Sequence, residues 1–449
     1  MSTATDTIAA IATAPGRGGI GVLRISGPGA ASIAQALAGK LPSPRHAALR
    51  DFRDAEDSVI DSGLVIHFLA PHSFTGEDVI ELQGHGGPVL LDLLLHAACA
   101  AGARLARPGE FSERAYLNGR FDLAQAEAIA DLIDAGSAAA VRAAHRSLHG
   151  EFSRQVAALV ETLIVLRADL EAALDFADED VPWLSGPQLQ RRLDELVTAL
   201  ENLLQKAAQG RRLREGLTIA IAGQPNVGKS TLLNRLAGTD AAIVAPTAGT
   251  TRDVLREHIN LAGLPLTVLD TAGLRDTVDT VEREGVRRAW AALAQAELVL
   301  FVADDRSGLS AIDEALLAQF PPALPVLLLL NKCDLSDRAG GLVELPDGRR
   351  ALRISAATEQ GIEHLIAGIT QAAGLSDIGA DQFTARTRHL DALRLAGRHL
   401  TAARAQALAA PELIAEELRL AQQALDEITG RFTSDDLLGR IFSQFCLGK

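Results

Sequence analysis

The sequence predicts a multidomain protein that combines α/β domains with an all-α domain. Its 449 residues are enough for about three domains of ordinary size. Residues 1–118 and 217–375 alternate strand-like apolar runs with helical patterns, whereas residues 119–212 and 380–449 have helical periodicity. We therefore expect an N-terminal α+β domain, a helical domain in two separated parts, and an inserted α/β domain whose mostly parallel sheet has helices on both faces.

The N-terminal domain should contain strands and helices joined by glycine-rich turns. The patterns occupy 20–25 and 62–68 for strands, and 30–38 and 88–101 for helices. Two glycine-rich stretches, 15–19 and 84–88, lack a lysine and do not match G-x-G-x-x-G. We expect turns there rather than a second nucleotide site.

The residues on both sides of the inserted domain share one composition. Ala, Leu, Glu, Asp and Arg with helical periodicity fill 122–135, 138–174, 187–209, 386–409 and 411–428. Helices before and after an insertion, each with an apolar face to bury, are most simply one helical domain. Residues 211–216 and 376–380 would be the two linkers, and a paired linker of this kind can act as a hinge.

A glycine-rich octamer follows the first apolar run of the inserted domain. It reads Gly-Gln-Pro-Asn-Val-Gly-Lys-Ser over 223–230, after the apolar residues 217–222 and before a helical pattern. A strand, a glycine-rich turn and a helix direct successive backbone N–H groups at one anion. The octamer therefore predicts a phosphate cradle, in which Lys229 reaches the β and γ phosphates and the Ser230 hydroxyl binds Mg²⁺.

Three later stretches predict which base is bound. Asp270 opens Asp-Thr-Ala-Gly after an apolar run, where its carboxylate can hold Mg²⁺ through water. Asp334 ends Asn-Lys-Cys-Asp after another buried-strand pattern, and an aspartate there can accept hydrogen bonds from both N1–H and N2–H₂ of guanine. Residues 355–356 fit the loop that closes over guanine O6. In this order the motifs predict GTP rather than ATP.

Charge and cysteine content narrow the class of protein. A formal net charge of −14 gives no general basic footprint, so any contact with nucleic acid must come from a local patch. This counts against a role in RNA binding. Cys99, Cys333 and Cys446 are odd in number and far apart, which indicates reduced thiols in a cytoplasmic protein. We expect neither a signal peptide nor a membrane span, because the longest apolar stretches are interrupted by charged and polar residues.

The chain ends in Phe-Cys-Leu-Gly-Lys, and Cys446 permits two interpretations. A lone cysteine is usually a small buried hydrophobe. Close to a terminus it could instead be a positioned nucleophile, because Lys449 would favour its thiolate and a thiolate can add to C6 of a pyrimidine. The residues alone leave both interpretations open.

Five stretches together resemble one family over essentially the whole chain. They are Gly-Gly-Ile-Gly-Val-Leu-Arg-Ile-Ser-Gly from Gly18, Arg-Pro-Gly-Glu-Phe-Ser-Glu-Arg-Ala-Tyr-Leu-Asn-Gly from Arg107, Asp-Leu-Ala-Gln-Ala-Glu-Ala-Ile-Ala-Asp-Leu-Ile from Asp122, Ala-Gly-Thr-Thr-Arg-Asp from Ala248, and the terminal Cys-Leu-Gly-Lys. The sequence is similar to the tRNA modification GTPases called MnmE or TrmE.

This resemblance implies a function and a set of partners. Members are homodimers that work with the flavoprotein MnmG and add an aminomethyl or carboxymethylaminomethyl group to C5 of the wobble uridine in certain tRNAs. The one-carbon unit comes from 5-formyltetrahydrofolate or a related tetrahydrofolate. The resemblance implies folate contacts at Arg24, Glu81, Arg120 and Lys449. Arg120 stands where lysine is usual, and the planar fork of arginine is not equivalent to a point charge.

The resemblance also extends the nucleotide site to a switch loop. Mg²⁺ would be held by Ser230 and Thr251. The expected nucleotide contacts are Asn226, Val227, Gly228, Lys229, Ser230, Thr231, Ala245, Pro246, Thr247, Ala248, Gly249, Thr250, Thr251, Asp270, Thr271, Ala272, Gly273, Asn331, Lys332, Asp334, Ser355 and Ala356.

The residue after Gly273 exposes a chemical gap. Ras-type GTPases orient the attacking water with a glutamine at this point, whereas this chain has Leu274. By resemblance, Glu282 fills that role through a bridging water, although Glu284 is a rival on spacing alone and a solvated helix face is the simpler interpretation. A bound K⁺ would supply the missing positive charge. Its oxygen ligands would be Asn226, Ala245, Thr247 and Thr250.

Two functions remain to be weighed. An enzyme of tRNA modification with a nucleotide-driven cycle uses every segment of the chain and is the function that we favour. The alternative is a switch or scaffold GTPase, for example in ribosome assembly, that does no chemistry of its own. The alternative leaves Cys446 and the N-terminal domain unexplained.

Overall fold

The computed structural model describes residues 6–175, 186–238, 256–261, 263–270, 293–375, 381–406, 411–430, 441, 442, 445 and 448. At 173–175, 186, 256 and 270 it describes the backbone alone. The chain divides into two compact units. The N-terminal unit comprises Met1–Ala130, Val156–Ala168 and Leu418–Lys449, and the central unit comprises Asp131–Gln155 and Asp169–Glu417.

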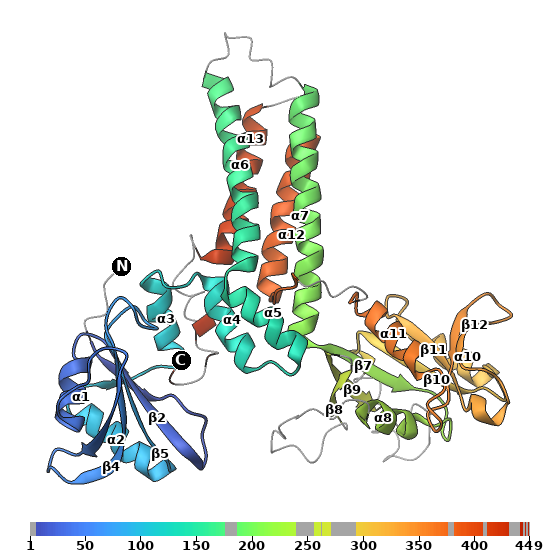
Figure 1. Ribbon diagram of the computed structural model, residues 1–449. Helices are drawn as coiled ribbons and strands as arrows, with labels where there is room; N and C mark the ends of the chain where they lie inside the picture. Colours follow the sequence, from blue (N-terminus) through green and yellow to red (C-terminus); the bar gives the residue numbers. More distant parts are fainter. Residues whose placement is uncertain are drawn as a thin grey trace. The chain divides into compact units, whose positions relative to one another are not determined.

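One six-stranded sheet organises the N-terminal unit, with strand order β3-β4-β5-β2-β1-β6 (Figure 1). Neighbouring strands are antiparallel except for the parallel pair β1 and β6. The strands are β1 (Ile8–Ile11), β2 (Gly18–Ser26), β3 (Ala47–Arg53), β4 (Val59–Phe68), β5 (Val79–Gly86) and β6 (Arg104–Leu105). Helices α1 (Ala30–Ala38) and α2 (Pro88–Ala100) cover one face. These elements confirm the strands and helices predicted for this part of the chain.

Alternation along the strands gives this sheet one apolar and one mixed face. In β5, Ile80 and Leu82 belong to the core beneath α1 and α2. Glu81 therefore points to the opposite face, because successive side chains of a strand alternate. The register of β2 and β5 sets Arg24 directly opposite Glu81. The face away from the two helices thus carries a charged pair.

The C-terminal residues pack against helices of the same unit. Helices α3 (Glu110–Leu117) and α4 (Leu123–Ile133) follow the sheet. Ile441, Phe442 and Phe445 form a buried cluster with Leu123 and Ala126. The Tyr116 hydroxyl, on α3, donates a hydrogen bond to the Gly430 carbonyl at 2.6 Å. Gly430 is thereby hydrogen-bonded to a residue more than 300 positions earlier.

A seven-stranded sheet forms the α/β part of the central unit, in the order β12-β13-β11-β10-β7-β9-β8 (Figure 1). The five middle strands are parallel, and the edge strands β12 and β8 are antiparallel to their neighbours. The strands are β7 (Leu217–Ala222), β8 (Arg256–Leu261), β9 (Leu264–Asp270), β10 (Leu298–Asp304), β11 (Val326–Asn331), β12 (Gly341–Glu344) and β13 (Arg350–Arg353). The accompanying helices are α8 (Lys229–Gly238), α10 (Ala311–Leu317), α11 (Ile362–Ala372) and the 3₁₀ helix η2 (Cys333–Leu335).

Both faces of this sheet are buried, which explains the continuous apolar runs. In β10, Leu298, Leu300 and Val302 belong to the core that includes α8 and α11. The alternate residues Val299 and Phe301 belong to the core that includes α10. A strand covered on both faces is apolar at every position. The predicted mostly parallel sheet with helices on both faces is confirmed.

Long helices make up the rest of the central unit. Helix α7 (Gly186–Glu215) packs on α12 (Thr387–Ala405) and on α5 (Ala138–Leu148), and the unit also includes parts of α6 (Glu151–Asp175) and α13 (Pro411–Thr429). Buried leucines recur every three or four residues along α7, at Leu189, Leu193, Leu196, Leu200 and Leu203. This spacing is typical of one apolar helix face.

The first predicted linker differs from the structure. Residues 211–215 are the last turn of α7, and β7 begins only two residues after the helix ends. Asp131 holds this end in place, because its Oδ1 accepts hydrogen bonds from Arg214 Nε and from Arg386 Nη2, both at 2.7 Å. The segment is therefore a fixed helix terminus rather than a loose connection. The second predicted linker, 376–380, lies outside the described residues.

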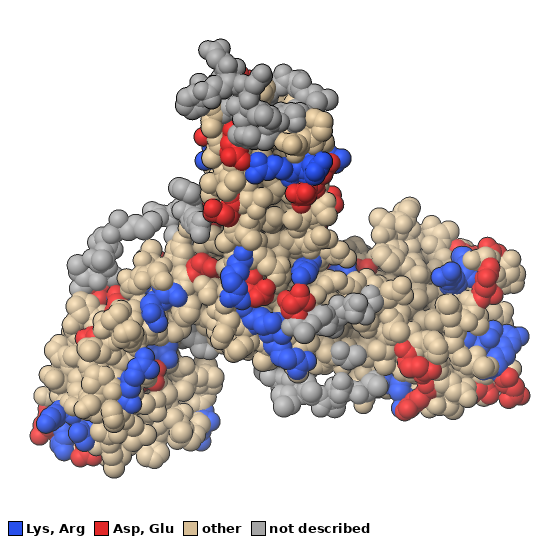
Figure 2. Space-filling model, turned by 45° about the horizontal axis from the view of Figure 1, so that its top comes forward, with Lys and Arg blue, Asp and Glu red and all other residues tan. Residues whose placement is uncertain are grey.

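Three further features bear on function. Among the described residues, no helix is long and apolar enough to cross a membrane. Figure 2 shows acidic and basic side chains interspersed on the face that it presents. Of the described cysteines, Cys99 and Cys333 are free thiols, and burial raises the pKa of each.

Candidate nucleotide-binding site

The glycine-rich loop lies at the carboxyl end of β7, where two glycines are sterically required. Gly223 has φ +140°, and a Cβ there would lie 2.1 Å from the Val302 carbonyl oxygen. Gly228 has φ +97°, and its Cβ would lie 2.4 Å from Asn331 Nδ2. Helix α8 begins at the next residue, Lys229. The predicted strand, turn and helix around the phosphate cradle are therefore present.

The lysine of the loop is held among backbone carbonyls. Lys229 Nζ donates hydrogen bonds to the carbonyl oxygens of Gly223 and Gln224, both at 2.9 Å. Its charge thus lies inside the curve of the loop. Ser230, the second residue of α8, is exposed. Asp270 ends β9 opposite Ile221 of β7, so Ser230 and Asp270, two of the positions predicted for the Mg²⁺ site, follow neighbouring strands.

Asn331 ties two loops of the site together. It ends β11 and is buried. Its Nδ2 donates to the Val227 carbonyl at 2.8 Å, and its Oδ1 accepts from the Ala356 N–H at 3.0 Å. One amide side chain therefore fixes both the phosphate loop and the loop predicted to cover the base. Arg235 of α8 also donates to the Ala356 carbonyl, at 3.2 Å.

Asp334 carries an oxygen that the protein leaves without a hydrogen-bond partner. Its Oδ1 is buried and accepts no hydrogen bond from any described residue. Buried polar atoms are nearly always hydrogen-bonded, so this oxygen has the capacity to accept a hydrogen bond from a bound ligand. The neighbouring Ser336 hydroxyl donates to the buried Asp305, which also accepts from Arg353 Nε at 2.8 Å. These contacts hold the turn that carries Asp334.

Two aspartates at the end of β10 were missed at the sequence level. Asp304 contacts Lys332, and Asp305 supports the Asp334 turn as described above. Both follow the apolar residues 298–303, as Asp270 follows its own apolar run. Because the carboxyl ends of parallel strands meet at one edge of the sheet, the same argument could have identified them.

The structure brings half of the predicted nucleotide contacts together, describes only the backbone of Asp270, and leaves the other contacts undescribed. Those gathered at this edge of the sheet are Asn226, Val227, Gly228, Lys229, Ser230, Thr231, Asn331, Lys332, Asp334, Ser355 and Ala356. Those outside the described residues are Ala245, Pro246, Thr247, Ala248, Gly249, Thr250, Thr251, Thr271, Ala272, Gly273, Leu274, Glu282, Glu284, Cys446 and Lys449.

A second cluster lies on the mixed face of the N-terminal sheet. Glu81 Oε1 accepts from Arg24 Nε at 3.1 Å and from Nη2 at 2.8 Å. Arg24 Nη1 donates to the Gly448 carbonyl at 3.3 Å, and its guanidinium carbon lies 5.5 Å from the centre of the Phe74 ring. Residue Gly448 has φ +88°, and a Cβ there would lie 2.4 Å from the Ile11 carbonyl oxygen. Gly448 therefore lies against β1 beside Arg24.

Arg120 belongs to the same unit and lies against a glycine turn. The Cγ of Arg120 would be 3.3 Å from a Cβ at Gly76. Asn118 Nδ2 donates to the Thr75 carbonyl at 2.8 Å and fixes that turn. The ring of Phe121, the next residue, lies 5.8 Å from the Phe74 ring. Contacts thus lead from Arg24 to Phe74 and from Phe74 to Phe121, the residue next to Arg120.

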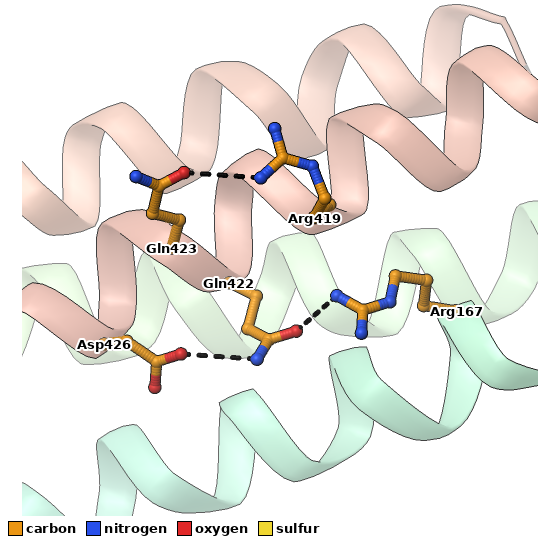
Figure 3. Close-up of a pocket in the computed structure, with 5 residues that line it drawn as sticks. All are labelled: Arg167, Arg419, Gln422, Gln423 and Asp426. Atoms are coloured by element: carbon orange, nitrogen blue, oxygen red, sulfur yellow. Dashed lines mark hydrogen bonds between the residues drawn. The ribbon is translucent and has the colours of Figure 1, made fainter. Parts of the chain in front are cut away.

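A polar cavity of about 390 Å³ lies between α6 and α13 in the N-terminal unit (Figure 3). Gln422 lies between its two charged partners, accepting from Arg167 Nη1 at 2.7 Å and donating to Asp426 Oδ2 at 3.3 Å. The cavity is also lined by Arg419 and Gln423. Its polar groups bind one another, which is typical of a structural network.

The parallel sheet, the glycine-rich loop and the Asn-Lys-Cys-Asp turn define a P-loop protein of the guanine-nucleotide-binding class. Family comparison is consistent with this class. The profile described as "GTP-binding protein TrmE N-terminus" matches residues 7–120, and the profile described as "MnmE helical domain" matches residues 123–446. The chain belongs to the MnmE (TrmE) family.

Relatives match along the entire chain. The sequence is 53% identical over 456 residues to the tRNA modification GTPase MnmE of Yersinia pseudotuberculosis serotype O:1b, with 100% of both chains covered. It is 54% identical over 455 residues to the protein of that name from Stutzerimonas stutzeri, again with 100% of both covered. Among solved structures, a variant of Aquifex aeolicus Era bound to GDP·AlF₄⁻ is 28% identical, with 41% of this chain and 66% of that chain covered and a TM-score of 0.28.

Proposed function

We propose that this protein is a GTPase that acts in tRNA modification. Membership of the family, and 53–54% identity to tRNA modification GTPases over the full chain, support this function. The observation that carries its GTP specificity is the buried Asp334 Oδ1, which lacks a donor among the described residues. Guanine offers donors at N1 and N2, where adenine has no matching pair.

Each part of GTP has candidate partners at this site. Lys229 and the loop N–H groups would hold the β and γ phosphates, because the start of α8 attracts anions. Ser230 and Thr251 would bind Mg²⁺ directly, with Asp270 acting through water. Asp334 and the Ala356 N–H would select the base. The wider set of contacts is the one predicted from the sequence.

Hydrolysis requires groups that Leu274 cannot supply. We propose that Glu282 orients the attacking water and that K⁺ is held by oxygens of Asn226, Ala245, Thr247 and Thr250. Asn226, the one of these four residues that the structure describes, fits this role. Its side chain is exposed and offers an amide oxygen from a backbone held at φ +64°. A cation there would supply the positive charge that arginine fingers supply elsewhere.

The N-terminal cluster is the proposed folate site. Arg24 is oriented by Glu81, and a held guanidinium suits a carboxylate or a polar heteroaromatic ring edge. Arg120 and Lys449 complete the proposed contacts with 5-formyltetrahydrofolate or a related tetrahydrofolate. Gly448, the described residue of the terminal Cys-Leu-Gly-Lys, lies beside Arg24 in this cluster. This proximity supports a role for Cys446 near the chemistry.

The remaining proposals concern partners and boundaries. We propose a cytoplasmic homodimer that works with the flavoprotein MnmG to add an aminomethyl or carboxymethylaminomethyl group to C5 of the wobble uridine. The domain boundaries are those predicted: 1–118 for the folate-binding and dimerising domain, 119–212 and 380–449 for the helical domain, and 217–375 for the G domain. Cys446→Ser should abolish tRNA modification and spare GTP hydrolysis; loss of fold would support the interpretation as a buried hydrophobe.

Base specificity provides the sharpest test of this function. In Asp334→Asn, the side-chain amide can donate to the C2 oxygen of xanthine but no longer accepts from two guanine donors. We expect GTP affinity to fall roughly 10²- to 10³-fold and xanthosine triphosphate to bind more tightly than GTP. Asp337→Asn, at an exposed position in the same turn, serves as the control and should leave both affinities near the wild-type values. Unchanged preference for GTP in Asp334→Asn would contradict the assignment.

A further inference from the structure

Asp304 stands at one end of a chain of contacts that reaches the phosphate loop. It is the last residue of β10, and its Oδ2 accepts a hydrogen bond from Lys332 Nζ at 3.0 Å. The same Lys332 Nζ donates to the Asn226 carbonyl oxygen at 2.5 Å. Asp304 is mostly buried, with 14% of its side chain exposed. The Lys332 ammonium group therefore links the Asp304 carboxylate to the phosphate loop.

The contact fixes a peptide group whose orientation matters for phosphate binding. A peptide bond is planar and trans, so the Asn226 carbonyl and the Val227 N–H point in opposite directions. Lys332 holds this peptide from the carbonyl side. Asn331 Nδ2 holds the following peptide in the same way, through the Val227 carbonyl at 2.8 Å. The N–H groups of Val227 and Gly228 are therefore directed away from these two anchors, as a phosphate cradle requires.

Both ends of the lysine contact have an unusual backbone. Lys332 has φ +69° and Asn226 has φ +64°, in the left-handed region where residues other than glycine are uncommon. Such conformations persist when surrounding contacts determine them. A lysine ammonium is a point charge on a flexible stem of four carbons, so its position depends on an anion that holds it. Asp304 is that anion.

Asp304 is itself held in an ionised and fixed state. Arg306 donates to it from the backbone N–H at 3.1 Å, from Nε at 2.9 Å and from Nη2 at 2.7 Å. These hydrogen bonds, followed by that from Lys332, hold the pKa of the carboxyl well below its ordinary value, although burial opposes them. The charge that Lys332 requires is therefore present throughout the neutral range.

We propose that Asp304 is a positioning residue for guanine-nucleotide binding, because it holds Lys332 on the Asn226 carbonyl and so directs the Val227 N–H into the phosphate cradle. The proposal rests on nucleotide binding at the site proposed above. It assigns Asp304 no contact with the nucleotide. Replacing Asp304 should therefore weaken the binding of GTP and GDP and should change the rate of GTP hydrolysis in the bound complex only slightly.

A second aspartate in the same domain provides a matched control. Asp347 accepts from the Arg349 backbone N–H at 3.0 Å and from Arg349 Nε at 2.7 Å, in the same two-residue arrangement as Asp304 and Arg306. It lies in the turn between β12 and β13. Asp347→Asn therefore removes the same local pairing without changing the contact to Lys332.

The test is a fluorescence titration of full-length variants with GDP and with a non-hydrolysable GTP analogue. Asp304→Asn should weaken both affinities roughly 5- to 20-fold, because an ionic hydrogen bond is lost indirectly. At saturating GTP its turnover should stay within about threefold of wild type. Asp304→Glu, which keeps the carboxylate, should stay within about threefold in affinity, and Asp347→Asn within about twofold. Hydrogen exchange at the 223–230 segment should accelerate in Asp304→Asn alone.

A double-mutant cycle separates the proposed contact from general destabilisation. If Asp304 acts through Lys332, then adding Asp304→Asn to Lys332→Gln should weaken GDP binding by less than about twofold further. Additive losses, or wild-type affinity in Asp304→Asn, would overturn the proposal. Should Asp304→Asn fail to fold, a loss of affinity of roughly 5- to 20-fold in a folded Asp304→Glu would overturn the proposal, and an affinity within about threefold of wild type would support it. A wild-type protein that does not bind GDP would overturn the proposed function as well, and the two failures are thereby distinguished.

Discussion

The nucleotide site and the Arg24 cluster are built in opposite ways. The nucleotide site consists of short contiguous motifs at the carboxyl ends of neighbouring parallel strands, and backbone N–H groups and carbonyls form much of it. The Arg24 cluster is made of side chains and of a backbone carbonyl 424 residues away from Arg24. A site built from local backbone geometry therefore has a sequence signature. A site that depends on strand register and on contacts with a residue distant in the chain has no sequence signature of its own.

The largest effect is expected in the nucleotide site, where Leu274 replaces the glutamine that orients the attacking water in Ras-type GTPases. Glu282→Ala should slow GTP hydrolysis roughly 10²- to 10⁴-fold without weakening GTP binding, because the proposed water-orienting group is lost. Single-turnover hydrolysis together with nucleotide titration measures both quantities. Glu284→Ala is the matched control and should hydrolyse GTP at nearly the wild-type rate. The reverse outcome would transfer the role to Glu284.

Replacement of the salt should produce the next largest effect. Exchanging K⁺ for Na⁺ should depress turnover roughly 10²- to 10³-fold, somewhat less than the loss of an arginine finger, because a smaller cation keeps the charge but not the geometry. GDP affinity in the two salts is the control, because the cation is proposed to act on hydrolysis. Equal turnover in both salts would show that K⁺ does not act in hydrolysis. Another group would then have to supply the positive charge at the nucleotide site.

The Arg24 cluster should respond to a change of a single side chain without affecting GTP. Glu81→Ala leaves the Arg24 guanidinium without the carboxylate that orients it, so 5-formyltetrahydrofolate should bind roughly tenfold more weakly. Calorimetric titration of the full-length protein measures this change, and the GTPase rate should stay at the wild-type value. Asp51→Asn removes an exposed pairing with Arg53 in the same unit and should not alter folate binding. Equal folate affinity in Glu81→Ala would place the folate elsewhere.

A further prediction, on folding rather than on activity, concerns the acid stability of the N-terminal unit. Burial alone would raise the pKa of Glu110, but hydrogen bonds from Arg104 and from the Arg107 N–H outweigh burial and lower the pKa to about 2. A carboxyl whose pKa is lower in the folded state stabilises the fold above the pKa of the unfolded chain. This stabilisation, about 3 kcal/mol, should disappear as the pH falls from about 4.5 to 2.

Urea unfolding of the wild type and of Glu110→Gln across this pH range measures the contribution. The variant should be less stable at pH 7 and should lose less stability on acidification than the wild type. Glu113→Gln, which removes the partner of an exposed Arg107 side chain, is the control. Parallel pH curves for the wild type and Glu110→Gln would show that other carboxyl groups govern acid unfolding.

The local elements could be predicted from the sequence, whereas the contacts between residues distant in the chain could not. The strands and helices around Lys229, and the mostly parallel sheet with both faces covered, followed from apolar runs and glycine positions. Asp304 and its lysine contact were missed, although a carboxylate after an apolar run was an available signal. Residues 211–215 were interpreted as a linker and are helical, because Asp131 fixes that helix end through contacts distant in sequence.

The sequence by itself determined what local chemistry fixes: which turns need glycine, which strands are buried on both faces, and which short motifs can bind phosphate and guanine. Family resemblance added the positions Arg24, Glu81 and Arg120. Only the tertiary structure decided that Glu81 orients Arg24, that Gly448 lies beside them, and that Lys332 joins Asp304 to Asn226. The physical reason is that these contacts depend on strand register and chain packing, which join residues that no local pattern relates.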